Sequence, residues 1–188
     1  ARVKHSHSRC SLRSHAVILG LLLWSSLNSY DQTISGKVVG IQDGDTFDML
    51  IDTTIVRMRL NGIDCPERRQ DFGSKAKEFT SALVFGQVVR ADVRMKDRYG
   101  RSVGDVFLSS GVNVSEEILR HGYGWHYKAY SKDLRLASLE AEARRMGLGL
   151  WASPNPVPPW DYRRGNRVVP APASPSVDDG AQQCSAIT

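Results

Sequence analysis

Hydrophobic and polar residues alternate over five short segments of the chain, and this alternation predicts five β-strands. The segments are residues 36–41, 46–51, 55–60, 87–94 and 102–108. In the third segment, Arg57 and Arg59 alternate with apolar residues, which is typical of a strand with one buried face. Asp43-Gly44 lies between the first two strands and favours a tight turn. We therefore expect short strands joined by turns in the early part of the chain.

Three further segments predict helices, and the first of them carries apolar residues spaced three and four apart. In residues 74–85 the apolar stripe includes Phe79, and Gly86 ends the helix. Residues 114–120 predict a short second helix, and residues 134–146 predict a third.

Five short strands and about three interleaved helices predict an α+β fold that is mostly β. We expect a small five-stranded barrel of the OB-fold type with the helices packed on it. Among five-stranded barrels, the OB-fold is the usual binder of oligonucleotides. The barrel domain is expected to span residues 34–152.

The two ends differ from this central domain. Residues 1–15 are basic and polar, residues 16–24 (AVILGLLLW) are apolar, and small residues follow, as in a secretory signal. The apolar run is too short for an ordinary membrane-spanning helix. We expect residues 1–30 to be a signal peptide or an N-terminal anchor, although an N-terminal core helix would show the same pattern. Residues 153–188 are rich in proline and predict an extended arm and a disordered tail.

A signal peptide implies an exported protein, either secreted or periplasmic, with a membrane contact only if the leader stays attached. The hydrophobic content of 41% and the charged content of 24% are ordinary for a soluble globular protein. The net charge of +5 comes largely from basic residues in the leader, so charge alone does not indicate a nucleic-acid partner. The three cysteines, Cys10, Cys65 and Cys184, have no zinc-site spacing.

Several short polar segments carry the candidate chemistry, and each has an ordinary explanation when it is taken alone. Residues 43–46 (DGDT) fit a hairpin turn, and residues 64–67 (DCPE) fit a loop. Arg59 on a strand could extend to the solvent, and Arg101 could be a turn residue.

Taken together, these segments supply what the hydrolysis of a phosphodiester requires. Asp45 and Asp64 provide carboxylate oxygens for a hard divalent cation. Glu67, three residues after Asp64, could hold a water molecule as general base. Arg59 and Arg101 could neutralise a phosphate whose charge grows in a pentacoordinate transition state.

Residues 36–151 resemble the staphylococcal nuclease (thermonuclease) family. The resemblance rests on motifs whose internal spacing fits without gaps: residues 41–46 (IQDGDT), 59–67 (RLNGIDCPE), 97–101 (DRYGR), 115–122 (SEEILRHG) and 150–151 (LW). It implies an OB-fold barrel and a calcium-dependent phosphodiesterase that acts on DNA and RNA and leaves 3′-phosphate ends.

The resemblance also implies roles for individual residues. Calcium would be held by Asp45, Asp64 and the backbone carbonyl of Cys65. The catalytic residues would be Arg59, Glu67 and Arg101. The substrate would be bound by Arg98, Tyr99, Tyr127, Lys128 and Tyr130.

The chain departs from the family pattern at several positions. Cys65 stands where family members often have Thr, and an exposed thiol there would be open to oxidation. The loop of residues 68–72 is shorter than in the best-known member. Lys128 stands at the position of one base-stacking tyrosine. Tyr127 or Trp125 could supply the missing ring, although Trp125 could equally belong to the core.

We therefore expect a calcium-dependent nuclease that acts on DNA and RNA as a monomer, with no obligate protein partner. The alternative is a catalytically inactive nucleic-acid-binding module on the same barrel. A degenerate copy would be expected to lose carboxylates or arginines at the site, and here all five side chains are present.

Overall fold

The computed structural model describes residues 32–165 of the chain. The predicted leader (residues 1–30) and residues 166–188 of the predicted tail lie outside the described residues, and so do Cys10 and Cys184. Within the described part, no helix is long and apolar enough to cross a membrane.

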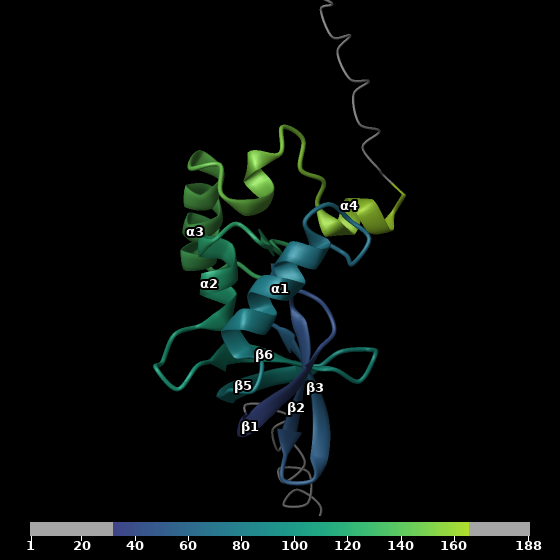
Figure 1. Ribbon diagram of the computed structural model, residues 1–188, viewed down its shortest axis with the longest axis vertical. Helices are drawn as coiled ribbons and strands as arrows, with labels where there is room; N and C mark the ends of the chain where they lie inside the picture. Colours follow the sequence, from purple (N-terminus) through teal and green to yellow (C-terminus); the bar gives the residue numbers. More distant parts are fainter. Residues whose placement is uncertain (1–31, 166–188) are drawn as a thin grey trace, which may run out of the picture.

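Five strands close into a barrel (Figure 1). They are β1 (Gln32–Ile41), β2 (Thr46–Ile51), β3 (Thr54–Leu60), β5 (Val88–Lys96) and β6 (Ser102–Phe107). The order around the barrel is β1-β2-β3-β6-β5, and β1 also pairs with β5. Neighbouring strands are antiparallel except β3 and β6, which are parallel. The predicted fold, an α+β protein built on a five-stranded OB-type barrel, is confirmed.

The alternation along the strands places every second side chain inside the barrel. Four apolar side chains of β2 and β3, each at most 1% exposed, belong to this interior: Phe47, Met49, Met58 and Leu60. Burying a side chain of this size contributes roughly 1.5–3 kcal/mol. Arg57, the residue before Met58, points outwards and pairs with Asp48 of β2 at 2.8 Å. A shift of one residue would exchange the two faces, so this burial fixes the register.

Three longer helices, all predicted from the sequence, accompany the barrel (Figure 1). They are α1 (Gly73–Val84), α2 (Val114–Arg120) and α3 (Leu134–Arg145). The side chain of Asn113 caps α2 by accepting hydrogen bonds from two backbone N–H groups of its first turn, and Asp133 caps α3 in the same way.

The structure also contains short elements that the sequence pattern does not predict. β4 (Ile63–Asp64) and β7 (Trp125–His126) pair as a small two-stranded sheet. A 3-10 helix, η1 (Gly149–Ala152), and a short helix, α4 (Pro159–Arg163), follow α3. The arm predicted as extended therefore contains a helix.

A second apolar cluster ties these short elements together. Its buried members are Trp125, Ala143, Leu150 and Trp151, and Phe72, Leu148 and Trp160 pack against them. The rings of Trp125 and Trp151 meet edge to face, with centroids 4.3 Å apart. Trp125 is only 5% exposed, so it is a core residue and not a free base-stacking ring. The cluster fixes β7, the loop before α1 and α4 against one another.

Candidate active site

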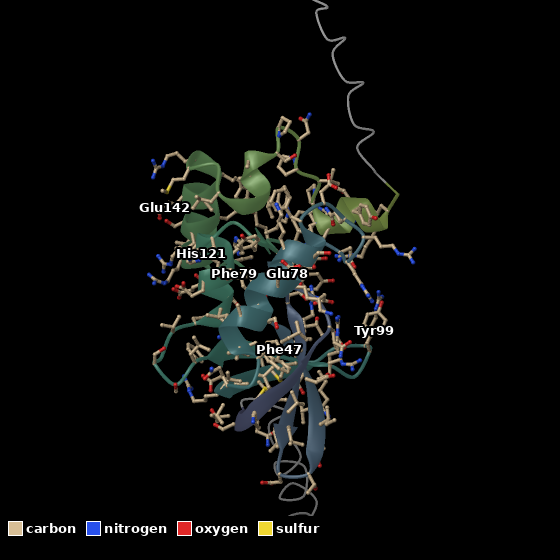
Figure 2. The ribbon with its side chains drawn as sticks, in the orientation of Figure 1. Phe47, Glu78, Phe79, Tyr99, His121 and Glu142 are labelled. Atoms are coloured by element: carbon tan, nitrogen blue, oxygen red, sulfur yellow. The ribbon has the colours of Figure 1, made fainter. Side chains whose placement is uncertain are left out.

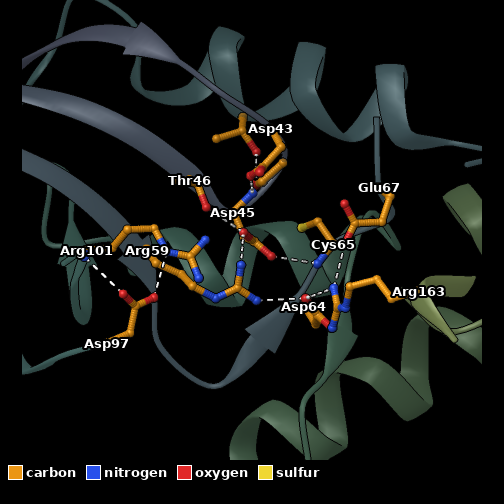
Figure 3. A network of polar contacts seen from close by, with 12 residues as sticks. Asp43, Asp45, Thr46, Arg59, Asp64, Cys65, Glu67, Asp97, Arg101 and Arg163 are labelled. Carbon is orange, nitrogen blue, oxygen red and sulfur yellow. Dashed lines mark hydrogen bonds and ion pairs between the residues drawn. The ribbon is translucent and has the colours of Figure 1, made fainter. Parts of the chain in front are cut away.

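Arg59 joins two acidic residues that come from different parts of the chain (Figure 3). Its Nη1 donates to Asp45 Oδ1 at 2.6 Å, and its Nη2 donates to Asp64 Oδ1 at 2.7 Å. The strands explain this meeting, because Arg59 is paired with Thr46, the residue after Asp45. Asp64 ends β4, the short strand that follows β3. One guanidinium thus neutralises two carboxylates that are 2% and 1% exposed.

Asp45 is held by further hydrogen bonds. Its Oδ1 accepts from the hydroxyl of Thr46 at 2.9 Å, and its Oδ2 accepts from the backbone N–H of Cys65 at 2.8 Å. Burial raises the pKa of this carboxyl to about 6, even though the charge of Arg59 lowers it. Burial therefore works against the charged form of this carboxylate, and Arg59 favours it.

The turn that carries Asp45 is fixed by close packing at Gly44. A Cβ atom at Gly44 would lie 2.7 Å from Cβ of Cys65 and 2.9 Å from Cβ of Ala76. The hydroxyl of Thr80 on α1 donates to the Gly44 carbonyl at 2.6 Å. Glycine is therefore needed here for close approach, and it lets the turn press against the Cys65 loop and α1.

The side chain of Cys65 lies in the same contact and is 4% exposed. Burial, together with the negative charge of Asp45, raises the pKa of the thiol well above its usual value. The cysteine is free. The expectation that this thiol is exposed and open to oxidation is therefore wrong, because the thiol is buried and protonated.

Glu67 lies on a loop that is closed by local hydrogen bonds. Its backbone N–H donates to Oε1 of Gln70 at 3.1 Å, and its carbonyl accepts from the N–H of Gln70 at 2.8 Å. A Cβ atom at Gly73 would lie 2.0 Å from the Glu67 carbonyl oxygen, so glycine is required where this loop enters α1. The Glu67 side chain is 38% exposed and can reach water.

Besides Arg59, a second arginine binds the carboxylates of the site, and the sequence pattern does not reveal it (Figure 3). Arg163 is the last residue of α4. Its Nη2 donates to Asp64 Oδ2 at 2.7 Å, and its Nη1 donates to Glu67 Oε1 at 2.6 Å. Arg163 is thus the residue that links the predicted general base to the predicted metal ligand.

Arg101 lies on the turn between β5 and β6 and is held by Asp97. The Asp97 carboxylate accepts hydrogen bonds from the backbone N–H of Tyr99 and from both the backbone N–H and Nε of Arg101, at 2.7–3.0 Å. The parallel pairing of Met58 with Ser102 places this turn beside the strand of Arg59. Among the described contacts, Arg101 pairs with Asp97 and not with the carboxylates bound by Arg59.

The predicted substrate-binding residues fall into two groups. Tyr99 is 68% exposed at the molecular surface (Figure 2), and Nη2 of Arg98 donates to its hydroxyl at 2.7 Å. Tyr130 is 77% exposed and lies 4.7 Å from the Tyr127 ring, measured between centroids. Lys128 pairs with the buried Glu140 at 3.4 Å.

Tyr127 does not offer both faces to a ligand. Its ring is stacked on Trp160 of the α4 segment, with an interplanar angle of 4° and centroids 5.2 Å apart. The exposed rings of Tyr99 and Tyr130 are therefore better placed for stacking than Tyr127.

The donor set of the site suits a hard divalent cation, because three carboxylates converge on one region. Four of their six oxygens already accept hydrogen bonds from the guanidinium groups of Arg59 and Arg163. Among residues 32–165, no group of three or more acidic, histidine or cysteine side chains is arranged as a ready metal site. The chemistry of the residues fits such an ion, but their arrangement would have to adjust to receive it.

A sequence profile of the family described as staphylococcal nuclease homologue matches residues 57–153, just over half of the chain. The chain belongs to the staphylococcal nuclease family. The part that matches includes Arg59, Asp64, Glu67 and Arg101 and ends before α4.

Relatives of this nuclease homologue come from bacteria and plants. An "uncharacterized endonuclease" of Escherichia coli O157:H7 is 41% identical over 130 residues, which is 69% of this chain and 85% of that protein. A "micrococcal nuclease" of Shigella flexneri is 39% identical over 142 residues, 70% of this chain and 82% of that protein. A "staphylococcal-like nuclease CAN1" of Arabidopsis thaliana is 44% identical over 111 residues, 59% of this chain but 34% of that protein. Nucleic acid is accordingly the implied substrate.

Proposed function

We propose that the protein is a calcium-dependent phosphodiesterase that hydrolyses DNA and RNA. The observation that carries this proposal is the meeting of Asp45, Asp64 and Glu67 around two arginines in one region of the molecule. Membership of a nuclease family supports the same reaction class. The carboxylate oxygens suit a hard divalent cation, and the choice of calcium among such cations comes from the resemblance to the staphylococcal nuclease family.

In this mechanism, Asp45, Asp64 and the carbonyl of Cys65 would hold the ion. When bound, it would supply positive charge that stabilises the reacting phosphate. Glu67 accepts a proton from the water molecule whose oxygen attacks phosphorus. The bond from phosphorus to the departing oxygen then breaks, and that oxygen takes a proton from solvent. Arg59 and Arg101 neutralise the charge that grows on the phosphate oxygens.

Substrate binding is assigned to the exposed aromatic and basic residues around this site. Arg98 and Tyr99 contact the phosphate backbone, and Tyr130 stacks on a base, with Tyr127 and Lys128 beside it. Stacking of a base on an aromatic ring contributes about 1–3 kcal/mol and is tolerant of sequence, which suits an enzyme that accepts both DNA and RNA. We propose further that the enzyme acts as a monomer and is exported by its leader, which the N-terminal residue of the mature protein would test.

The experiment that tests the proposal measures cleavage of a plasmid and of an RNA by the wild type and by Glu67→Gln. Both are assayed with calcium, with magnesium and with a chelator. Loss of a general base lowers the rate by about 10²–10⁴-fold, so we expect Glu67→Gln to be nearly inactive in calcium and the wild type to be inactive in chelator.

Glu78→Gln provides a matched control, because Glu78 is an exposed glutamate on α1 and has no assigned role in the mechanism (Figure 2). It should cleave like the wild type. Equal rates for Glu67→Gln and the wild type would remove Glu67 from the mechanism. A gel shift without cleavage under any of the conditions would favour the inactive binding module instead.

A further inference from the structure

The guanidinium of Arg163 lies where two carboxylates of the site converge. It donates to both oxygens of Asp64, at 2.7 and 3.4 Å, and to Oε1 of Glu67 at 2.6 Å. Asp64 is 1% exposed, and its other strong partner is Arg59. Both Asp64 oxygens therefore carry a cationic partner, and one partner comes from a helix outside the residues that match the nuclease family.

The position of Arg163 is determined by the packing of the segment before it. Nε2 of Gln70 donates to the carbonyl of Val157 at 2.5 Å, and the hydroxyl of Tyr162 donates to the carbonyl of Arg69 at 3.1 Å. These bonds tie the α4 segment to the loop that carries Glu67. Trp160 adds its stack on Tyr127 and its edge contact with Trp125. The contact of Arg163 with the site is therefore built into the structure at several points.

A divalent cation held by Asp45 and Asp64, as in the proposed mechanism, would need the Asp64 oxygens that Arg163 now holds. Two positive groups in this position would repel each other, and they would compete for the same lone pairs. Binding of the ion thus requires Arg163 to withdraw from Asp64. Arg163 is the last residue of the five-residue helix α4.

We propose that Arg163 and the divalent cation are alternative partners of the Asp64 carboxylate, so that α4 sets the metal affinity of the enzyme. The inference rests on the proposed function, because the cation is the one assigned there. In the metal-free protein, Arg163 holds the general base and a metal ligand together. In the metal-bound protein, it is released, and the contacts of Trp160 loosen with it.

The test is a calorimetric titration of the full chain with calcium chloride. We expect Arg163→Gln to bind calcium about five- to tenfold more tightly than the wild type, since it lacks the competing guanidinium. Arg163→Lys keeps the charge but not the two-pronged contact, so its affinity should lie between the two. Arg164→Gln is the matched control: Arg164 is an exposed neighbour that pairs with Asp161 at 3.7 Å, and its loss should leave the affinity unchanged.

Tryptophan fluorescence gives a second readout that does not depend on activity. Calcium should change the tryptophan emission of the wild type. This change should be much smaller in Trp160→Phe, which lacks the reporting ring, and in Arg163→Gln, in which α4 no longer contacts the site through residue 163. Calcium affinity in Arg163→Gln that is equal to or weaker than in the wild type would overturn the competition. If the wild type binds and uses calcium in that case, the proposed function stands without it. If neither protein binds calcium and cleavage needs no metal, both proposals fail.

Discussion

Arg59 is the residue on which the electrostatics of the site depend. Its side chain is 16% exposed, and it pairs with Asp45 and Asp64, whose side chains are 3% and 1% exposed. Without the guanidinium, two like charges would remain close together and almost without water. A buried charge that loses its partner costs far more than an exposed one.

We expect Arg59→Gln to lower the free energy of unfolding by about 3–5 kcal/mol in the presence of a chelator, because it removes the arginine that pairs with the buried Asp45 and leaves the buried Asp64 with Arg163 alone. Arg57→Gln, on the same strand, removes a 51% exposed arginine from its pair with Asp48 and should cost at most about 1 kcal/mol. Urea unfolding followed by circular dichroism measures both. Similar losses for the two variants would contradict the structural importance of the buried pairs.

His126 is a second residue whose burial has a measurable consequence. It is 3% exposed, its Nε2 lies 3.1 Å from Oγ of Ser131, and burial is the main reason that its pKa is lowered from 6.5. Glu140 acts in the opposite direction, and Lys128 adds to the lowering. The folded protein therefore keeps the imidazole neutral, while the unfolded chain protonates it at a higher pH.

Because the unfolded state binds the extra proton, the contribution of His126 to stability is fully present above pH 6.5 and is lost as the pH falls through the lower, folded-state pKa. We expect the free energy of unfolding to decline over this window, and His126→Gln to show a shallower decline. Denaturant curves at a series of pH values provide the comparison. Parallel pH profiles for the wild type and the variant would show that the imidazole does not contribute to the pH dependence of the free energy of unfolding.

At the scale of single residues, much of the site could be predicted because its parts lie in short local motifs. Asp45 is in a turn motif, and Asp64 and Glu67 are three residues apart. Arg163 could not be found in this way, since it is 99 residues from Asp64 and no spacing rule connects them. The burial of Cys65 was also not predictable, because it depends on the packing of Gly44 from a distant turn.

The elements of the structure differ in how far the local sequence determines them. The barrel strands and the three long helices have strong periodic patterns, and the sequence predicts them. β4 and β7 are two residues long and exist through the pairing of Asp64 with Trp125, which no local pattern reveals. α4 is a single short helix in a proline-rich segment, and its one local signal is Pro159 at its first turn.

The loop of residues 67–73 and α4 support each other, so removing one should loosen the other. We expect a chain that ends at residue 153 to lose the bonds of Val157 and Tyr162 to this loop and the stack of Trp160. Amide hydrogen exchange in the loop should become faster, because local openings follow the number of contacts that hold a segment.

Exchange in β2 and β3 serves as the internal reference for this experiment. These strands belong to the main core and not to the second apolar cluster, so their protection should be retained. Mass spectrometry of the two proteins resolves the peptides concerned. Faster exchange throughout the barrel in the shortened chain would mean that the segment after residue 153 is part of the main folding unit.

At the scale of the whole molecule, the barrel and the site are coupled by one parallel strand pair. β3 pairs with β6 through Met58–Ser102 and Leu60–Gly104, which closes the barrel between segments far apart in the sequence. The same pairing brings the turn of Arg101 beside the strand of Arg59. The site is therefore complete only when the barrel has closed, and such non-local contacts form slowly in folding.

Closure of the barrel also affects how the protein behaves in a crowded solution. Each of the five barrel strands between residues 32 and 107 has a neighbour on both sides over at least part of its length, so little of their backbone is offered along a free sheet margin. Amyloid-like growth adds strands to such a margin. Closure thus limits amyloid-like stacking of the native protein, and a proteolytic cut that detached β1 would expose β2 and β5 to it.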